Sequence, residues 1–216
     1  MWRAMIYKEL RELFGIAALA TAALFLFSGS EMRMSFRPLF EPSRSVPFLG
    51  NEFYYYFAMI AVGFTVLIGF KQTAWELWQG TFLFLFHRPS SRSELIFAKL
   101  SIGLAVYLIC SAIPILCVAI WAATPGTHAS PFEWSMTLSM WKLWISLTLI
   151  YLGAFASGMV DGKWYGIRLL PLATSLLTTT GVYFIPWLWI SVPLFVFSFA
   201  VFVVIIQHVA RTRDYS

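Results

Sequence analysis

The chain has 216 residues, of which 60% are hydrophobic, 19% aromatic and only 12% charged. This composition is too apolar for a soluble domain and predicts an integral membrane protein. The formal charge of +5 accompanies no basic stripe or RNA-binding motif, which argues against nucleic acid as a partner. The two cysteines, Cys110 and Cys117, lie in an apolar run without CxxC spacing, which favours packing over a redox or metal role.

Six stretches of the sequence are long and apolar enough to cross a lipid bilayer, which takes about 20 mostly apolar residues in a helix. We predict spans over residues 13–28, 53–70, 95–123, 138–160, 167–185 and 187–206. The last two spans divide one apolar block, so we expect a helical hairpin that turns near Pro186. The predicted fold class is an all-α integral membrane protein, with a single transmembrane domain over residues 1–216.

The residues before the first span, 1–12, have the pattern of an amphipathic helix. Their apolar side chains recur at 3–4 spacing, whereas Lys8, Arg11 and Glu12 fall on the other face. Glu9 is an imperfection, because it falls on the apolar face. The pattern predicts an interfacial helix at the membrane surface. A plain extension of span one and a cleavable signal peptide are the alternatives, and the two glutamates argue against the signal peptide.

The distribution of lysine and arginine predicts the orientation of the chain. With six spans both termini share one side, and the opposite side receives only four of the 15 basic residues: Arg33, Arg37, Arg44 and Lys142. Because basic loops are retained in the cytoplasm, both termini are predicted to be cytoplasmic. The expected location is a cell membrane, inner or plasma, which the chain crosses several times.

The segment between spans two and three, ELWQGTFLFLFHRPSSRSELIFAK over residues 76–99, interrupts the apolar pattern. It predicts a short aromatic-rich helix that Gly80 loosens and a later proline ends. A new helix follows, which Ser90 or Ser91 caps, and Ser91 has the spacing of a capping box to Glu94. An apolar segment of this kind completes no crossing, so it needs cover from the membrane or from a partner protein.

The sequence offers no set of residues for catalysis. The predicted span centres hold no ionisable side chain, and the three histidines lie in loops or at a span end. The motif GMVDGKW at residues 158–164 has neither the spacing nor the preceding strand of a phosphate-binding loop. We therefore expect no catalytic residue, no metal site and no cofactor in this chain, and an intramembrane enzyme is disfavoured.

The segment after span two, the N-terminal YKELREL and the six-span topology together resemble the permease subunits of type-2 ABC transporters. In that family a cytoplasmic coupling helix docks on the ATP-binding subunit. The resemblance implies that this chain forms the translocation pathway of an ATP-driven exporter as a dimer, with a second permease copy or a related permease. It also implies that ATP and Mg bind to a separate ATP-binding subunit.

The resemblance places partner docking in a coupling segment over residues 74–90 and just after it. Glu76 is expected to pair with basic groups of the ATP-binding subunit. The aromatic residues Trp75, Trp78 and Phe82 are candidates to fill a groove of that subunit, although anchoring in the lipid interface explains the tryptophans equally well. The positions that match the family motif are Glu76, Gly80, Thr81, Pro89, Arg92 and Lys99.

Span five has a small, weakly polar face, because Thr174, Thr178 and Gly181 follow i, i+4, i+7 spacing. These residues are candidates for the pathway or the dimer interface, and helix packing alone explains them equally well. The turn after span five is tighter than is usual in the family, so residues 178–193 are expected to form at most a reduced re-entrant hairpin. The lack of deep charges favours an amphipathic or lipophilic cargo. A membrane scaffold or assembly factor that binds a cytoplasmic partner is the alternative function.

Overall fold

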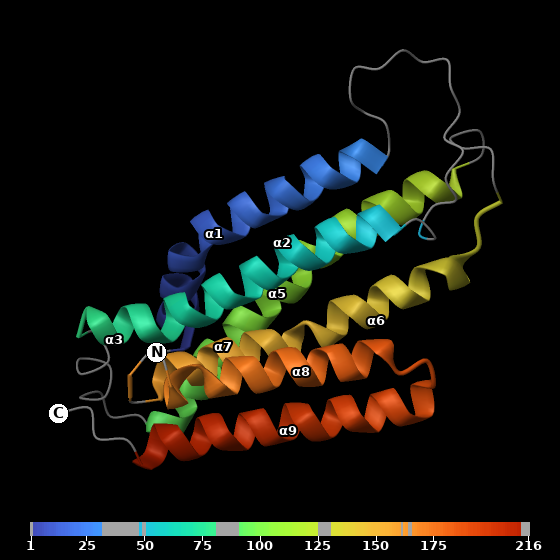
Figure 1. Cartoon of the computed structure of the whole chain (residues 1–216). Helices are drawn as coiled ribbons and strands as arrows, with labels where there is room; N and C mark the ends of the chain where they lie inside the picture. Colours follow the sequence, from blue (N-terminus) through green and yellow to red (C-terminus); the bar gives the residue numbers. More distant parts are fainter. Residues whose placement is uncertain are drawn as a thin grey trace.

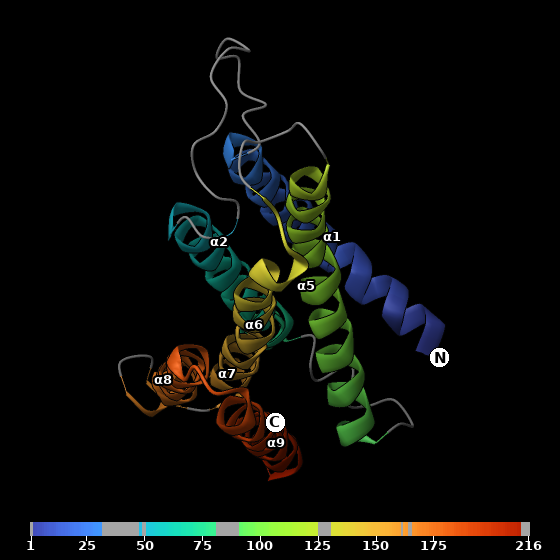
Figure 2. The same ribbon diagram turned by 90° about the vertical axis from the view of Figure 1, so that its right-hand side faces the viewer.

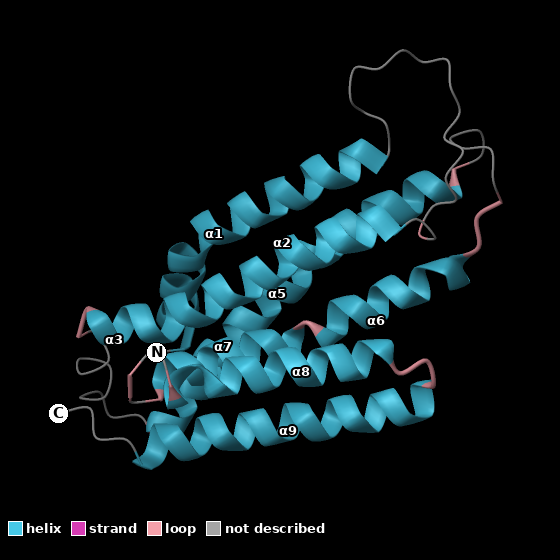
Figure 3. Cartoon of the chain, viewed as in Figure 1, coloured by secondary structure: helices cyan, strands magenta, loops and turns pink. Residues whose placement is uncertain are grey.

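Helices account for all of the regular secondary structure in the part of the chain that the structure describes. The structure is a computed structural model, and it describes residues 2–31, 48, 51–80, 91–124, 131–160, 162–163 and 166–212. The long helices pack side by side as a bundle (Figures 1 and 3). The predicted all-α class is thereby confirmed.

The helices and turns follow one another along the chain from Trp2 to Thr212. In order they are α1 (Trp2–Glu31), α2 (Asn51–Phe70), the π turn η1 (Lys71–Trp75), α3 (Glu76–Trp78), α5 (Arg92–Ala123), the 3-10 turn η2 (Trp134–Thr137), α6 (Leu138–Ser146), α7 (Thr148–Met159), the 3-10 turn η3 (Ile167–Leu169), α8 (Leu170–Phe184) and α9 (Leu188–Thr212). Because α2, η1 and α3 are consecutive, they form one rod, which ends at Trp78.

Five helical runs are long and apolar enough to cross a membrane, and they correspond to predicted spans one to four and six. These runs are Met5–Ser28, Phe53–Trp78, Arg92–Ala123, Trp134–Met159 and Leu188–Thr212. The predicted fifth span is α8, whose 15 residues measure about 22 Å at 1.5 Å per residue, less than the ~30 Å hydrocarbon layer. The described residues therefore contain five to six helices suited to a membrane, and the sixth crossing stays a prediction.

Helices α8 and α9 form the predicted hairpin. α8 ends at Phe184 and α9 begins two residues after Pro186, so residues 178–193 are the end of one helix, a tight turn and the start of the next. The carbonyl of Ile185, just after α8, accepts a hydrogen bond from the ammonium group of Lys142 on α6. A lysine at the C-terminal end of a helix is favourable for the helix dipole, and this one fixes the turn to α6.

The N-terminal helix is continuous with span one. α1 is helical without a break from Trp2 to Glu31, so its first residues do not form a helix of their own, although α1 changes direction part-way along its length (Figure 1). The physical reason is the lack of a helix breaker, because α1 contains no proline and a lone glycine such as Gly15 does not end a helix. That the first residues of α1 lie at the membrane surface stays a prediction.

Helix α7 is the centre of the bundle. Every residue from Thr148 to Met159 is buried, and α2, α8 and α9 pack closely around it. Figure 2 shows α6 and α7 between α2 and the α8–α9 hairpin. Small residues permit this packing, since a Cβ atom added at Gly69 of α2 would lie only 2.7 Å from the Cβ of Ala154. On the other side of α2, α1 packs against both α2 and α5.

One end of the bundle holds the N-terminus, α3 and the C-terminus, whereas the α8–α9 turn lies at the opposite end (Figure 1). We call the first the terminal end. The start of α5 and the end of α9 also meet there, where Nε of Arg211 donates a hydrogen bond to Oγ of Ser93 at 3.0 Å. That the terminal end faces the cytoplasm stays a prediction from the distribution of basic residues.

Candidate functional site

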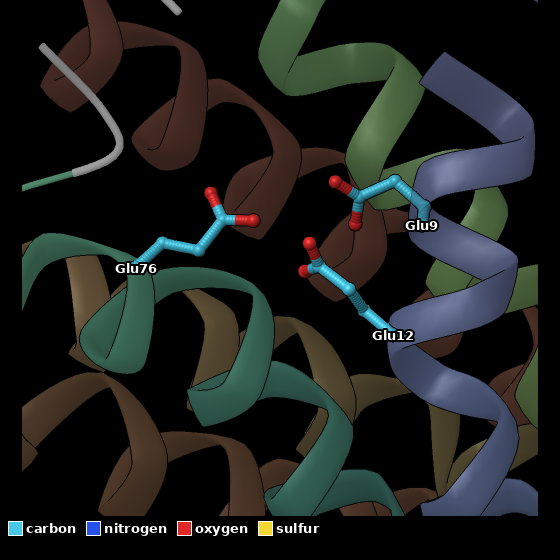
Figure 4. Close-up of side chains that lie close together, drawn as sticks. All are labelled: Glu9, Glu12 and Glu76. Carbon is cyan, nitrogen blue, oxygen red and sulfur yellow. The ribbon is translucent and has the colours of Figure 1, made fainter. Parts of the chain in front are cut away.

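Five charged side chains meet at the terminal end, and we call them the ion-pair cluster: Lys8, Glu9 and Glu12 of α1, Glu76 of α3 and Lys99 of α5. Figure 4 shows the three carboxylates, which point toward one another from α1 and α3. The cluster joins three segments that lie far apart in the sequence.

Lys99 holds the buried centre of the cluster. Its Nζ atom lies 2.5 Å from Oε1 of Glu9 and 2.6 Å from Oε1 of Glu76. The exposed fractions of the Lys99, Glu9 and Glu76 side chains are 1%, 1% and 3%. Removal of one partner from a buried ion pair costs about 3–5 kcal/mol, because it leaves an uncompensated charge. The pairs therefore fix α1, α3 and α5 relative to one another.

Lys8 and Glu12 form the exposed edge of the cluster. Nζ of Lys8 lies 3.3 Å from Oε1 of Glu76 and 3.5 Å from Oε1 of Glu12. The side chains of Lys8 and Glu12 are 38% and 36% exposed, so water screens this edge. Exposed ion pairs contribute about 0–1 kcal/mol, and the edge is therefore much weaker than the buried centre.

Gln72 of the π turn connects the cluster to the central helix. Its Nε2 donates hydrogen bonds to Oε2 of Glu9 at 3.1 Å and to the backbone carbonyl of Lys99 at 2.9 Å. Its Oε1 accepts a hydrogen bond from the Tyr151 hydroxyl of α7 at 2.8 Å. Gly103 of α5 leaves the space for this meeting, because a Cβ there would lie 2.2 Å from Gln72 Oε1. The polar network thus extends from α1 to α7.

The neighbouring residue, Thr73, also points into the bundle. Its Oγ1 donates a hydrogen bond to the carbonyl of Gly69, one turn earlier, at 2.6 Å. Such bonds from a side chain back to its own helix bend the helix. Gly158 of α7 leaves room for this side chain, since a Cβ at that position would lie 1.9 Å from Thr73 Oγ1. The π turn therefore packs into a notch of the central helix.

The three glutamates also have the spacing of a metal-ligand set. Glu9, Glu12 and Glu76 place carboxylate oxygens within 4.8 Å of one another, and carboxylate oxygens suit Mg or Ca. However, the ammonium groups of Lys8 and Lys99 already lie against these oxygens. A metal ion would have to displace both lysines, so we interpret the arrangement as an ion-pair cluster.

Two of the residues expected to dock on a partner, Glu76 and Lys99, lie inside the chain. The structure brings them together, which the sequence analysis did not anticipate. Both lie within the long apolar helices and not in a loop. Because their side chains are buried against Glu9, they stabilise this conformation and offer no exposed charge to a partner. Docking of a partner elsewhere on the segment stays a prediction.

Three other residues of the docking prediction lie on the surface. Trp75 and Trp78 are 44% and 78% exposed, and their rings meet edge to face with centroids 5.4 Å apart. Arg92 is exposed at the first turn of α5. Gly80 has a φ of +68°, a left-handed conformation that favours glycine, and it ends the helix instead of loosening its middle. Thr81, Phe82 and Pro89 lie outside the described residues.

The predicted cap of the following helix is confirmed. α5 begins at Arg92, and Oγ of Ser91 accepts a hydrogen bond from the backbone N–H of Glu94 at 3.3 Å. This cap satisfies one of the backbone donors that the first turn of a helix leaves unpaired. It fixes the start of α5, so that Lys99 lies two turns inside the helix and faces the cluster.

Thr174, Thr178 and Gly181 of α8, which were expected to line a pathway or a dimer interface, are half-buried. The hydroxyls of Thr174 and Thr178 donate to backbone carbonyls of their own helix at 3.0 Å. A Cβ at Gly181 would meet no atom within 4 Å. Ser175 and Thr179, one position later along the helix, are the buried residues that face the bundle. The role of Thr174, Thr178 and Gly181 as pathway or interface therefore stays a prediction.

Sequence reasoning missed Glu9, Gln72 and Tyr151 as members of the site. Glu9 gave a usable signal, because an acidic residue on an apolar helix face needs a buried partner. Gln72 gave a weaker one, as a polar residue at the end of an apolar span. Tyr151 gave none, since it lies within the apolar fourth span and an aromatic residue there usually indicates packing.

The chain was compared with protein-family models, curated proteins and solved structures. No family model matches it, and no curated protein or solved structure is significantly similar to it. The resemblance to transporter permeases therefore depends on the motifs of this chain alone.

Proposed function

We propose that the chain is the membrane-spanning permease subunit of an ATP-driven exporter of the ABC class. In this proposal it lies in a cell membrane and pairs with a second permease copy or a related permease to form the pathway. It docks on a separate ATP-binding subunit, which carries the ATP and Mg. The observation that supports the proposal is the ion-pair cluster, because it connects the segment after span two to the rest of the bundle.

The cluster offers a route for mechanical force. A pull on α3 acts on Glu76, and through Lys99 it acts on α5 and on Glu9 of α1. Gln72 in the same rod bonds to Tyr151 of the central helix α7. An ATP-driven permease needs such a connection, because movement at the docked segment must change the positions of helices deeper in the membrane.

The exposed pair of Trp75 and Trp78 is the proposed contact with the ATP-binding subunit. Large aromatic side chains provide much of the binding energy at protein interfaces. The pair lies on the same short stretch of helix as Glu76, which points inward while the two rings point outward. A partner that binds the two tryptophan rings would therefore transmit its movement directly to the buried ion pair between Glu76 and Lys99.

Copurification tests the proposal. The full chain, purified from its native membranes, is expected to carry an ATP-binding subunit, which mass spectrometry and an ATPase assay identify. Trp78→Ala is expected to weaken this association about tenfold, equivalent to about 1.4 kcal/mol. Trp189→Ala is the matched control, because Trp189 is about as exposed but lies in the first turn of α9, next to the α8–α9 turn. This variant is expected to bind as the wild type does.

Absence of an ATP-binding subunit from the purified chain would contradict the proposal, as would equal loss of binding in the two variants. A bound partner without any ATP-dependent movement of the helices would indicate the scaffold function instead. Glu76→Lys is a poor docking variant, because it reverses a buried charge and is expected to unfold the terminal end.

A further inference from the structure

The π turn η1 divides the rod that α2 and α3 form. The backbone on both sides is α-helical, with φ and ψ of −70° and −34° at Phe70 and of −67° and −35° at Glu76. A π turn closes with i→i+5 hydrogen bonds, so it accommodates one more residue than an α turn, and single π turns inside α-helices are frequent at functional sites. The rod therefore carries one extra residue just before Glu76.

The extra residue decides which side chains face the bundle beyond it. Each residue of an α-helix adds about 100° of rotation and 1.5 Å of rise. If the π turn became an α-helix with the same residues, α3 would turn by about 100° and advance by about 1.5 Å relative to α2. Glu76 would then leave Lys99, and Trp78 would leave its present position on the surface.

Contacts with the interior hold the π turn in place. Gln72 bonds to Glu9, to the carbonyl of Lys99 and to Tyr151. Thr73 bonds to the carbonyl of Gly69. The buried ion pair between Glu76 and Lys99 then fixes the helix just beyond the turn. Because π geometry is rare and these contacts lie at the turn and just beyond it, we infer that the register of α3 depends on them.

We propose that η1 is a two-state register switch, which takes α-helical geometry when the ion pair between Glu76 and Lys99 opens. In the closed state the π turn is present and Glu76 lies against Lys99. In the open state the rod is α-helical throughout, and Glu76 to Trp78 are turned outward by about one residue of register. The switch is a property of the chain alone. It goes beyond the proposed function, to which it adds an element that a docked partner can move.

Distances between two spin labels on the full-length chain test the switch. Met59 and Trp78 are exposed and lie on either side of η1, so cysteines at these positions carry the labels. Cys110 and Cys117 are replaced by serine to prevent labelling elsewhere. The otherwise unaltered chain is expected to give one distance, which corresponds to the closed state, with no partner present.

Two variants are expected to open the switch. Lys99→Met removes the ammonium group that holds Glu76, and it is expected to add a second distance population. Thr73→Val removes only the hydroxyl that bonds to Gly69, so it perturbs the fold less and keeps the test available if Lys99→Met does not fold. It is expected to add the same population at a lower level. Lys71→Met is the control. It removes a cation on the same turn whose Nζ atom lies over the Trp75 ring, 4.6 Å from the ring centroid, and not against the ion pair.

Deletion of Ala74 provides the decisive comparison. The deletion removes the extra residue, so the rod becomes α-helical while Glu76 still faces Lys99. Lys99→Met in the deletion background is therefore expected to keep a single distance, whereas the same change alone gives two. One unchanged distance in both Lys99→Met and Thr73→Val would overturn the proposal. A second distance that persists after the deletion would also overturn it, because it would not arise from the extra residue.

Discussion

Glu9 occupies a position where an isolated carboxylate is costly, on the apolar face of an amphipathic helix. It is stable there because both of its oxygens have partners, Lys99 at Oε1 and Gln72 at Oε2. If a buried charge of this kind alone is replaced by a neutral residue, the charge of its partner is left uncompensated in an apolar environment. Each buried charge therefore depends on the others, and the terminal end loses stability when any one of them is removed alone.

Replacement of Lys99 by methionine is expected to destabilise the fold by about 3–5 kcal/mol, because two buried carboxylates lose the ammonium group between them. The triple replacement Glu9→Gln, Glu76→Gln and Lys99→Met is expected to cost less than the single one, since it leaves no buried charge at the centre. Unfolding followed by circular dichroism in detergent measures both. Lys8→Met, at the exposed edge, serves as the control and is expected to stay within about 1 kcal/mol. A triple variant less stable than Lys99→Met would contradict the assignment.

The sequence indicated Glu76 and Lys99 as important but assigned them to an external partner. The reason is that their contacts are long-range: Lys99 is 23 residues from Glu76 and 90 residues from Glu9. Spacing along one helix cannot show that three helices bring these groups together. The mismatch of Glu9 with its helix face was the local signal of a buried partner, and it identified neither the partner nor the helix that carries it.

At the scale of the helix, the fourth span is interrupted by a turn, which we call the joint. α6 and α7 meet at a turn at Leu147, in the interior of the run Trp134–Met159. Irregular backbone at this depth is tolerated only where protein groups satisfy its hydrogen bonds. The hydroxyl of Tyr107 on α5 donates to the carbonyl of Trp144 at 2.8 Å, and that of Thr179 on α8 donates to the carbonyl of Ser146 at 3.3 Å. Neighbouring helices thus supply the donors at the joint.

Tyr107→Phe is expected to destabilise the fold by about 1–3 kcal/mol, because it removes the buried hydroxyl that donates to the carbonyl of Trp144. Tyr55→Phe is the matched control, since Tyr55 is exposed on α2 and loses the same atom without a buried acceptor. The difference in melting temperature between the two variants measures the effect. Equal melting temperatures would show that the Tyr107 hydroxyl does not stabilise the joint.

The sequence predicted most helices within a few residues, because apolar length, the cap at Ser91 and the turn at Pro186 are local signals. It did not predict the joint at Leu147, because no glycine or proline lies within five residues of it. It also assigned the amphipathic start of α1 and its apolar remainder to different environments. In the structure the helix continues through both, since a change of environment does not by itself break backbone hydrogen bonds.

At the scale of the whole molecule, the described chain separates two ends that differ in composition. The terminal end holds the ion-pair cluster and both ends of the described chain (Figure 1). The opposite end holds the α8–α9 turn, where Trp187 is exposed. If α8 crosses the membrane, these two ends face opposite compartments, and the distribution of basic residues predicts that the terminal end faces the cytoplasm.

Labelling from one side of the membrane tests this topology. With Cys110 and Cys117 replaced by serine, Trp187→Cys is expected to react with a membrane-impermeant maleimide added to intact cells. Lys163→Cys, in the exposed connection between α7 and α8, is expected to react only after the cells are permeabilised. Reaction of both from the same side would show that α8 does not cross, and the reverse pattern would show the opposite orientation.

Synthesis of the chain reaches α7 before two of the helices that enclose it. α8 and α9 follow α7 in the sequence, yet they cover much of its surface. The hydroxyl of Ser157 on α7 also accepts a hydrogen bond from the backbone N–H of Leu172, in the first turn of α8, at 2.9 Å. Until the α8–α9 hairpin has inserted, this side of α7 is uncovered, and the Ser157 hydroxyl lacks the hydrogen bond from Leu172. A nascent chain that ends at Met159 therefore lacks the two helices that close its core.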